Sequence, residues 1–381
     1  MASFPPPPSD TVDWLTLGTK FCEVNGHVES TYSKSTGRWT PLRFVTDPYK
    51  RVHGLAPGLN YGQQVLEGLK AFRGPNDGEI NIFRPDANAR RMQHSADVVS
   101  IPRVPIDMFV QACRSAVARN AEFIPPHASG GTTYVRPLLY GSSPHLMMSP
   151  PDDYTFCVFV VPVGGMPSAK PVRAIIVDKF DRSAPHGTGN AKLGGNYAPV
   201  LRWSEAMKKE GFGMILHLDS ARHDEIDEFS TAGFIGVKDN GPDDVTLVVP
   251  DSQCIIESIT SISVLRIAES FGWKVDKRVV KSTELGDFDE VMAAGTFLNL
   301  VPIRSVTRRT DLWEIPEGPR VSSGPGNRLV TYMSETQDDG GPIYQKLLAQ
   351  LRAIQRGQAK DEFDWRSTVT EEDLIKCPPR D

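Results

Sequence analysis

The sequence predicts an α+β protein with two domains, and three observations support this expectation. The chain has 381 residues, which is long for a single hydrophobic core. Strand-like and helix-like segments mix in both halves, without the regular βαβ alternation of a doubly wound sheet. Prolines and glycines crowd into residues 162–171, which makes this stretch the best linker candidate. We therefore expect a small domain over 1–163, a linker over 164–172 and a larger domain over 173–381.

Each half contains its own strands and helices. Runs rich in β-branched and aromatic residues predict strands at residues 79–83, 133–138, 156–163, 172–177, 213–218 and 245–249. Apolar residues at helical spacing predict helices near residues 86–98, 106–120, 196–209, 260–271 and 341–355. Asp86, after Pro85, is a good N-cap for the first of these helices.

Charge and composition exclude several classes of partner. The 42 Lys and Arg residues against 47 Asp and Glu give a net charge of -5, and no run of one sign suggests a nucleic-acid or membrane surface. No stretch approaches the roughly eighteen apolar residues of a membrane span. The N-terminus carries neither a signal-peptide core nor a transit-peptide pattern, so we expect a cytoplasmic protein. The scattered cysteines predict reduced thiols and no metal site: Cys22, Cys113, Cys157, Cys254 and Cys377.

A glycine-rich loop carries the most distinctive chemistry of the chain. Residues 186–197 contain four glycines and a single lysine, Lys192. Glycine permits tight backbone turns and close approach, so the loop is suited to delivering one amine to a fixed point. The loop lacks the Gly-Lys-Ser/Thr order of a phosphate-binding P-loop. A constrained and partly desolvated lysine is typical of a Schiff-base nucleophile, although a solvated surface lysine is the simpler alternative.

A pyridoxal cofactor on Lys192 would require further groups. A carboxylate must face the ring nitrogen, and Glu225, Asp227 and Glu228 are candidates, unless this acidic cluster is only a solvated turn. A phosphate needs backbone amides at a helix N-terminus and a cation. Residues 258–260 and 295–296 offer such amides and hydroxyls, although both can cap helices without a ligand. Arginine suits phosphate and carboxylate, and the candidates are Arg90, Arg91 and Arg136.

Several motifs together resemble the branched-chain amino acid aminotransferases, which are fold type IV pyridoxal phosphate enzymes. In chain order, the similar stretches are residues 60–72, 83–85, 91–96, 134–137, 187–197, 295–296 and 301–302. The resemblance runs from about residue 40 to residues 363–365 and leaves out only the two ends. It implies a small N-terminal α/β domain and a larger C-terminal domain with a pseudo-barrel sheet.

The resemblance also implies a role for each matching residue. Lys192 would be the catalytic Schiff-base lysine and proton carrier, with Glu228 on the pyridine nitrogen and Tyr197 on the ring hydroxyl. The phosphate would be held by Arg91, Ile259, Thr260, Gly295 and Thr296. The substrate and its carboxylate would contact Tyr61, Leu66, Tyr134, Arg136 and the amides of Thr296 and Phe297.

Two departures from the family pattern qualify these roles. Gly233 stands where the family usually has an asparagine, which removes a polar group beside the cofactor. Residues 297–300 replace the Cys-x-x-Cys pair of eukaryotic members, so no thiol regulation is expected. Phe297, together with Leu66 where phenylalanine is common, leaves the amino acid preference open.

The resemblance favours a transaminase that moves an amino group from a branched-chain or related hydrophobic amino acid to 2-oxoglutarate. Its partners would be an amino donor, a 2-oxo acid and a second copy of the chain in a homodimer. Two alternatives remain open. The same fold supports (R)-selective amine and D-amino acid transaminases, and a cofactor-binding protein without turnover is also conceivable.

Overall fold

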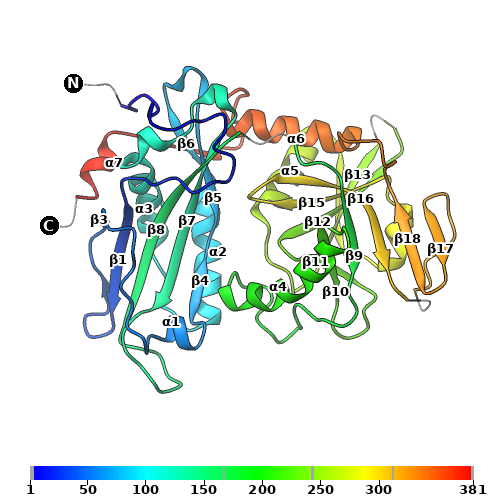
Figure 1. Cartoon of the computed structure of the whole chain (residues 1–381), viewed down its shortest axis with the longest axis horizontal. Coiled ribbons are helices and arrows are strands. Elements are labelled where there is room, and N and C mark those ends of the chain that lie inside the picture. The colour runs from blue at the N-terminus through cyan, green and yellow to red at the C-terminus, as the bar shows by residue number, and fades with distance from the viewer. Residues whose placement is uncertain (1–3, 166–167, 242–243, 311–312, 379–381) are drawn as a thin grey trace. The chain divides into compact units, whose positions relative to one another are not determined.

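The computed structural model describes residues 4–165, 168–241, 244–310 and 313–378. The chain forms two compact units, whose elements are labelled in Figure 1. Unit 1 comprises Met1–Pro167, Lys192–Gly195 and Arg352–Asp381, and unit 2 comprises Ser168–Ala191 and Asn196–Leu351. The short segment that carries Lys192 is therefore part of unit 1, although unit 2 precedes and follows it in sequence.

Unit 1 is built on one antiparallel sheet in the order β19-β6-β5-β7-β8-β1-β2, with β3 on β1 and β4 on β7. The strands are β1 (His27–Ser33), β2 (Arg38–Trp39), β3 (Arg43–Val45), β4 (Gln64–Leu66), β5 (Leu69–Arg73), β6 (Ile80–Phe83), β7 (Thr132–Gly141), β8 (Asp153–Val163) and β19 (Arg366–Val369). In β7, buried and half-buried residues alternate strictly, because successive side chains point to opposite faces.

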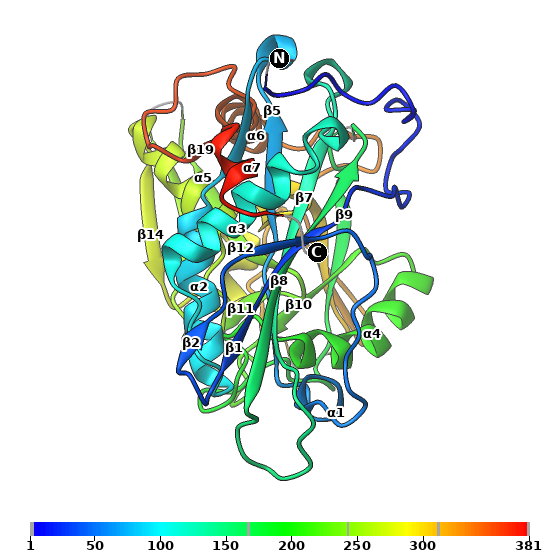
Figure 2. The same ribbon diagram turned by 90° about the vertical axis from the view of Figure 1, so that its left-hand side faces the viewer.

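Helices α2 and α3 pack against each other in unit 1, as Figure 2 shows. The α3 side that faces the sheet is apolar, and its Phe109 stacks on Phe156 of β8 with ring centroids 5.9 Å apart. Helix α2 begins at Pro85, and Arg84, with a φ of 50°, is its N-cap. The expected N-cap Asp86 lies instead in the first turn, where a negative charge also favours the helix. The helices of unit 1 are α1 (Pro57–Asn60), α2 (Pro85–Val98), α3 (Ile106–Ala118) and α7 (Glu372–Ile375).

Unit 2 contains a closed six-stranded barrel, because β15 pairs with both β12 and β16 and completes the ring β12-β11-β10-β9-β16-β15. Strands β13 and β14 extend the sheet beyond β12, and β18 and β17 extend it beyond β16. The strands are β9 (Val172–Ile176), β10 (Met214–Leu218), β11 (Ile226–Phe229), β12 (Ala232–Asp239), β13 (Val245–Pro250), β14 (Lys274–Arg278), β15 (Glu290–Gly295), β16 (Asn299–Arg308), β17 (Val321–Gly324) and β18 (Asn327–Thr331).

Phe229, Phe234 and Phe288 form an aromatic centre in the apolar core of unit 2. The remaining α-helices are α4 (Gly194–Lys209), α5 (Ile259–Ser270) and α6 (Pro342–Gln355). The short 3₁₀ helices are η1 (Pro75–Asp77), η2 (Ala121–Phe123), η3 (His127–Ser129) and η4 (Ser282–Asp287).

The strands and helices expected from the sequence correspond to observed elements. The domain boundaries expected from the sequence stay a prediction, and Met166 and Pro167 of the expected linker 164–172 lie outside the described residues. Those boundaries do not include the return of residues 352–381 to unit 1, where β19 pairs with β6. Within the part of the chain that the structure describes, no helix has the length and apolar character needed to cross a membrane.

Candidate active site

The backbone of Lys192 is held on both sides by unit 1. Its amide donates a hydrogen bond to Ser95 Oγ at 2.9 Å, and its carbonyl accepts one from the amide of Leu66 at 3.1 Å. The next residue, Leu193, forms an antiparallel bridge with Val65 of β4. These contacts fix the position of the Lys192 backbone on α2 and β4.

A buried ion pair lies directly beside this segment. The Glu67 side chain is fully buried, and its two oxygens accept from Nε and Nη2 of Arg91, each at 2.7 Å. Asn88 Nδ2 and the Gly68 amide donate further bonds to Oε2 at 2.7 and 3.1 Å. Burial would raise the pKa of Glu67, but the charge of Arg91, aided by that of Lys192, outweighs burial and lowers it. The arginine expected at the phosphate is therefore held in a fixed orientation.

Cationic side chains gather on one face of the unit 1 sheet. Arg136 Nη2 donates to Tyr134 Oη at 3.2 Å, and the guanidinium carbon lies 5.0 Å from the tyrosine ring centroid. Gly68 leaves room for that hydroxyl, since a Cβ there would lie 1.9 Å from it. Lys70 is paired with Tyr134 across β5 and β7 and so shares its face. Burial, aided by the charge of Arg352, lowers the pKa of Lys70 to about 7. This face suits an anionic substrate group.

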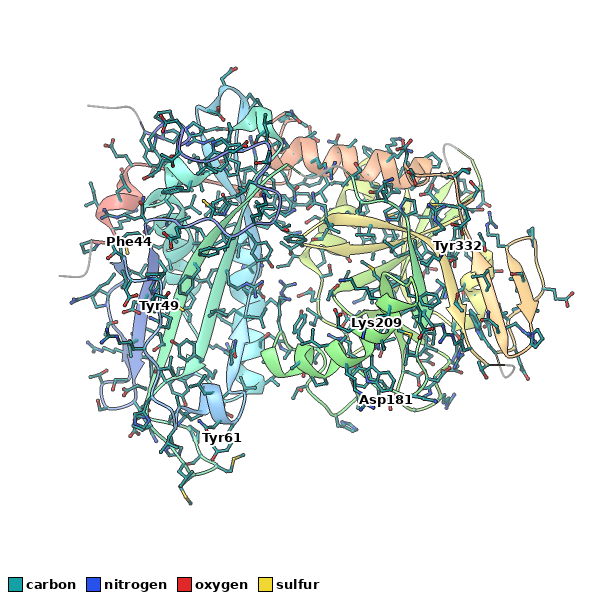
Figure 3. All side chains as sticks on the ribbon, in the orientation of Figure 1. Phe44, Tyr49, Tyr61, Asp181, Lys209 and Tyr332 are labelled. Atoms are coloured by element: carbon teal, nitrogen blue, oxygen red, sulfur yellow. The ribbon has the colours of Figure 1, made fainter. Side chains whose placement is uncertain are left out.

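Tyr61 contacts a different part of unit 1. Its hydroxyl donates to the carbonyl of Leu146 at 2.6 Å, and the side chain is partly exposed (Figure 3). It lines a cavity of about 310 Å³. The other lining residues are Pro57, Gly62, Gln63, Val99, Ser100, Met147, Met148, Ser149 and Pro150. Unit 1 therefore brings Leu66 against Lys192, whereas Tyr61 packs on the loop after β7.

The three candidate carboxylates of unit 2 have different surroundings. Glu225 is half-buried and pairs with Lys281 at 2.8 Å. Asp227 is buried and accepts from Ser252 Oγ at 2.6 Å, and burial raises its pKa. Glu228, also buried, follows Asp227 on β11, so the two side chains point to opposite faces. Only Glu228 forms an ion pair with an arginine: Arg182 Nη1 lies 2.7 Å from its Oε1.

The N-terminus of α5 lies near this carboxylate. The Ile256 amide, just before α5, donates to Glu228 Oε1 at 3.0 Å. Ser258 caps the helix by accepting from the Ser261 amide, and its hydroxyl donates to the carbonyl of Ala294 at 2.9 Å. Since Ala294 directly precedes Gly295 and Thr296, unit 2 brings together the neighbourhood of Glu228, Ile259, Thr260, Gly295 and Thr296. Helix amides and hydroxyls there can bind a phosphate.

Gly233 fills the place of the family's asparagine for a packing reason. It pairs with Glu228 on one side and with Ala294 on the other. A Cβ at this position would lie 2.6 Å from Ser261 Oγ and 3.2 Å from Ser258 Cβ. Hydroxyl side chains from the start of α5 thus occupy the space that an asparagine would need.

The two other predicted residues of unit 2 lie at the edges of elements. Tyr197 is half-buried in the first turn of α4. Phe297 lies in the turn between β15 and β16 with 43% of its surface exposed. The cysteine pair of related enzymes has its counterpart in this turn, where Phe297 presents an apolar ring.

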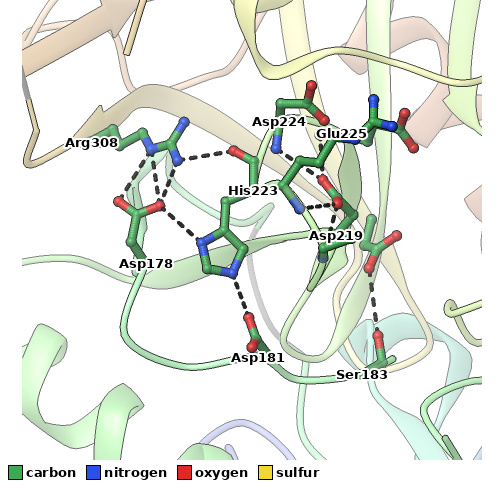
Figure 4. A network of polar contacts seen from close by, with 11 residues as sticks. Asp178, Asp181, Ser183, Asp219, His223, Asp224, Glu225 and Arg308 are labelled. Carbon is green, nitrogen blue, oxygen red and sulfur yellow. Dashed lines mark hydrogen bonds and ion pairs between the residues drawn. The ribbon is translucent and has the colours of Figure 1, made fainter. Parts of the chain in front are cut away.

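The segment that leads to Lys192, residues 178–189, is anchored to unit 2 by polar contacts that sequence reasoning missed. We call it the lead-in loop. Figure 4 shows Arg308 bonded to both oxygens of Asp178 and donating to the carbonyl of His223 at 2.9 Å. His223 Nε2 contacts Asp181 at 2.7 Å, and Ser183 Oγ donates to Asp227 at 3.5 Å. Arg182 lies between Asp181 and Ser183 in sequence and forms the ion pair with Glu228.

Comparison with known proteins agrees with this architecture. The unit 1 sheet and the closed barrel of unit 2 make up fold type IV, the fold of the branched-chain aminotransferases. Residues 64–306 match the family amino-transferase class IV. The chain belongs to this family, whose members depend on pyridoxal phosphate.

Fungal relatives match nearly the whole chain. Aminotransferase poxL of Penicillium oxalicum is 48% identical over 97% of this chain and 96% of its own. The branched-chain amino acid aminotransferase gloG of Glarea lozoyensis is 46% identical over 97% of this chain and 99% of its own. Among solved structures, the branched-chain aminotransferase of Escherichia coli has a TM-score of 0.70 at 22% identity, covering 91% of this chain and all of that one. The last comparison shows the fold alone.

Proposed function

We propose that the chain is a pyridoxal phosphate-dependent transaminase that moves an amino group from a branched-chain or related hydrophobic L-amino acid to 2-oxoglutarate. One observation carries the proposal: the backbone of Lys192 is pinned between Ser95 and Leu66, beside the buried Glu67–Arg91 pair. A lysine whose backbone is held this firmly suits a nucleophile that also carries a proton.

The residues present fit the charges of the cofactor. Pyridoxal phosphate, when bound, would supply an electron sink that makes the substrate Cα–H bond acidic. In unit 2, Glu228 would hold the ring nitrogen in its protonated form. The phosphate would be met by Thr260, Thr296 and amides from Ile259, Thr260 and Gly295, and in unit 1 by Arg91. Tyr197 would donate to the ring hydroxyl.

The side chains of this chain have separate tasks in the reaction. Lys192 Nζ would hold the cofactor and would carry a proton to and from the substrate carbon. Tyr134 and Arg136 would bind a carboxylate. Lys70 shares their face of the sheet, but burial lowers its pKa to about 7, so it is only partly charged near pH 7. Arg136 would suit the second carboxylate of 2-oxoglutarate, and Leu66 in unit 1 and Phe297 in unit 2 are apolar candidates for contact with a branched side chain. The relative gloG, named a branched-chain aminotransferase, supports this choice.

The proposal includes a homodimer. Several exposed apolar residues occur in or next to α1 and in the loop after β7: Leu55, Leu59, Tyr61, Leu146, Met147 and Met148. Exposed apolar groups of this kind are typical of interaction surfaces. Sedimentation should give twice the mass of the chain, and a fully active monomer would contradict the dimer.

A spectroscopic half-reaction screen tests the activity. The chain loaded with pyridoxal phosphate should lose its visible absorbance on addition of L-leucine and regain it with 2-oxoglutarate. D-amino acids and an (R)-arylamine, tested at the same concentration, should react far more slowly. Faster reaction with the (R)-arylamine would point to an amine transaminase. Bound cofactor that reacts with no amino donor would point to a protein without turnover.

A further inference from the structure

Arg182 stands out among the charged residues because it is buried. It is not one of the arginines that the sequence suggested for phosphate or substrate binding. Its side chain is 3% exposed, and Nη1 lies 2.7 Å from Oε1 of Glu228, which is 4% exposed. The same nitrogen donates to the carbonyl of Gly189 at 3.3 Å. Arg182 therefore joins the lead-in loop to the carboxylate on β11.

Two contacts of Glu228 hold the same carboxylate oxygen, Oε1. The guanidinium of Arg182 and the amide of Ile256 both contact Oε1. Two donors on one oxygen define both the position and the rotation of the group. A carboxylate buried without a counter-charge favours its neutral form, whereas a guanidinium at hydrogen-bond distance favours the ionised form.

The charge of Arg182 also acts on two other titratable groups: it helps to lower the pKa of His217, and it opposes the rise that burial causes in the pKa of Asp227. His217 is buried, and burial together with the charge of Arg182 lowers its pKa to about 3, so it is neutral near pH 7. Asp227 accepts hydrogen bonds from the hydroxyls of Ser252 and Ser183. Glu228 is thus the carboxylate that Arg182 contacts directly.

We propose that Arg182 is a positioning residue for the reaction: it keeps Glu228 charged and fixed, so that this carboxylate can hold the cofactor's ring nitrogen protonated. This inference rests on the proposed function. A neutral Glu228 would leave the ring nitrogen unprotonated and weaken the electron sink. Arg182 would therefore affect the chemical step and cofactor binding through Glu228.

A double-mutant cycle separates this role from simple support of the lead-in loop. The variants are Arg182→Gln, Glu228→Gln and the double variant in the full-length chain. Arg308→Gln is the matched control, since it removes the other buried arginine that anchors the same loop, at Asp178. Each variant is assayed for the dissociation constant of pyridoxal phosphate, for the visible spectrum as a function of pH, and for kcat and KM with L-leucine.

Arg182→Gln should weaken cofactor binding and lower kcat, each by about tenfold or more, with a smaller change in KM. In the Glu228→Gln background, the same substitution should add less than about twofold, since its route of action is gone. Arg308→Gln should leave the visible spectrum unchanged. Arg182→Lys, which keeps the charge, should restore part of kcat and serves as the test if Arg182→Gln does not fold.

Additive effects of Arg182→Gln and Glu228→Gln would overturn the inference, as would a spectral change of equal size in Arg308→Gln. A Lys variant as impaired as Glu228→Gln would do the same. Failure of the proposed function looks different: the unaltered chain would then bind no pyridoxal phosphate, and the inference would fall with it.

Discussion

Among the described residues, units 1 and 2 each bury one ion pair between arginine and glutamate, but the two pairs are built differently. In unit 1, both oxygens of Glu67 accept from Arg91, and two neighbouring groups add further bonds. In unit 2, the contacts from Arg182 and from the Ile256 amide converge on Oε1 of Glu228. The first arrangement orients an arginine by means of a carboxylate, and the second orients a carboxylate by means of an arginine.

The difference follows from the charges that the proposed cofactor presents. A phosphate needs a cation, and Arg91, held by Glu67, would supply it. A protonated ring nitrogen needs an anion, and Glu228, held by Arg182, would supply it. In both units the pair has one supporting member and one working member, and burial makes each pair rigid.

The largest effect is expected from removing the amine of Lys192. Lys192→Ala should abolish the visible absorbance of the bound cofactor and lower kcat by at least about a thousandfold. Lys179→Ala, an exposed lysine in the lead-in loop, should change neither. Retention of the absorbance and of turnover in Lys192→Ala would reject its role.

The Glu67–Arg91 pair of unit 1, in which both carboxylate oxygens are bonded, should contribute more to the free energy of unfolding than the Glu228–Arg182 pair of unit 2. Glu67→Gln leaves Arg91 buried without its counter-charge, so the free energy of unfolding should fall by about 3 kcal/mol. Glu228→Gln should cost less. The double variant Glu67→Leu/Arg91→Met should recover part of the loss. Urea unfolding of the cofactor-free chain measures all three, and a larger loss in Glu228→Gln would reverse the comparison.

Packing beside Glu228 can be tested by restoring the asparagine of related enzymes. Gly233→Asn should lower the free energy of unfolding by about 2 kcal/mol, because the new side chain meets Ser261 and Ser258. Adding Ser261→Ala should recover part of this loss. Gly318→Asn, at a position with open space around it, should have little effect. An unchanged urea midpoint in Gly233→Asn would show that the space is available.

Unit 1 offers a matched pair of serines for testing the anchor of Lys192. Ser95→Ala leaves the Lys192 amide without this acceptor, so stability should fall by about 1 kcal/mol and pyridoxal phosphate should bind several-fold more weakly. Ser115→Ala removes another buried bond, to the carbonyl of Asp373 at 2.9 Å. It should cost similar stability but leave cofactor affinity unchanged. Equal losses of affinity in both variants would contradict a specific anchor.

The smallest effect concerns pH and distinguishes unit 2 from unit 1. His217 has its pKa lowered from 6.5 to about 3, mainly by burial, so the unfolded chain binds a proton below pH 6.5 that the folded chain does not. The free energy of unfolding should therefore decrease by about 1 kcal/mol as the pH is lowered from 6.5 to 5.5. His217→Gln, which can still reach Ser230, should reduce this dependence. Urea midpoints over this range provide the measurement.

The sequence predicts the site where its signal is local. The glycine pattern around Lys192 is contiguous, so one short stretch indicates its chemistry. Choosing Glu228 over Glu225 and Asp227 required the family resemblance. The structure adds a physical distinction, because strand alternation sends Asp227 and Glu228 to opposite faces of β11.

Other features leave no local signal. Arg182 is a single arginine in a polar loop, and its partner Glu228 lies 46 residues further along the chain. Strand β16 is buried along its whole length, so its residues do not alternate between polar and apolar and no strand was predicted there. Lys70 was overlooked because a buried lysine cannot be told from an exposed one without the fold.

The pairing of β19 with β6 has a consequence for how the protein is made. The first sheet receives its edge strand from residues 366–369, which leave the ribosome after every strand of the barrel. Until then, β6 presents an open edge, and such edges recruit other chains. Every strand of the ring in unit 2 is synthesised before residues 366–369, whereas the sheet of unit 1 lacks its edge strand until these residues appear. Synthesis therefore completes unit 2 before unit 1, although unit 1 begins nearer to the N-terminus.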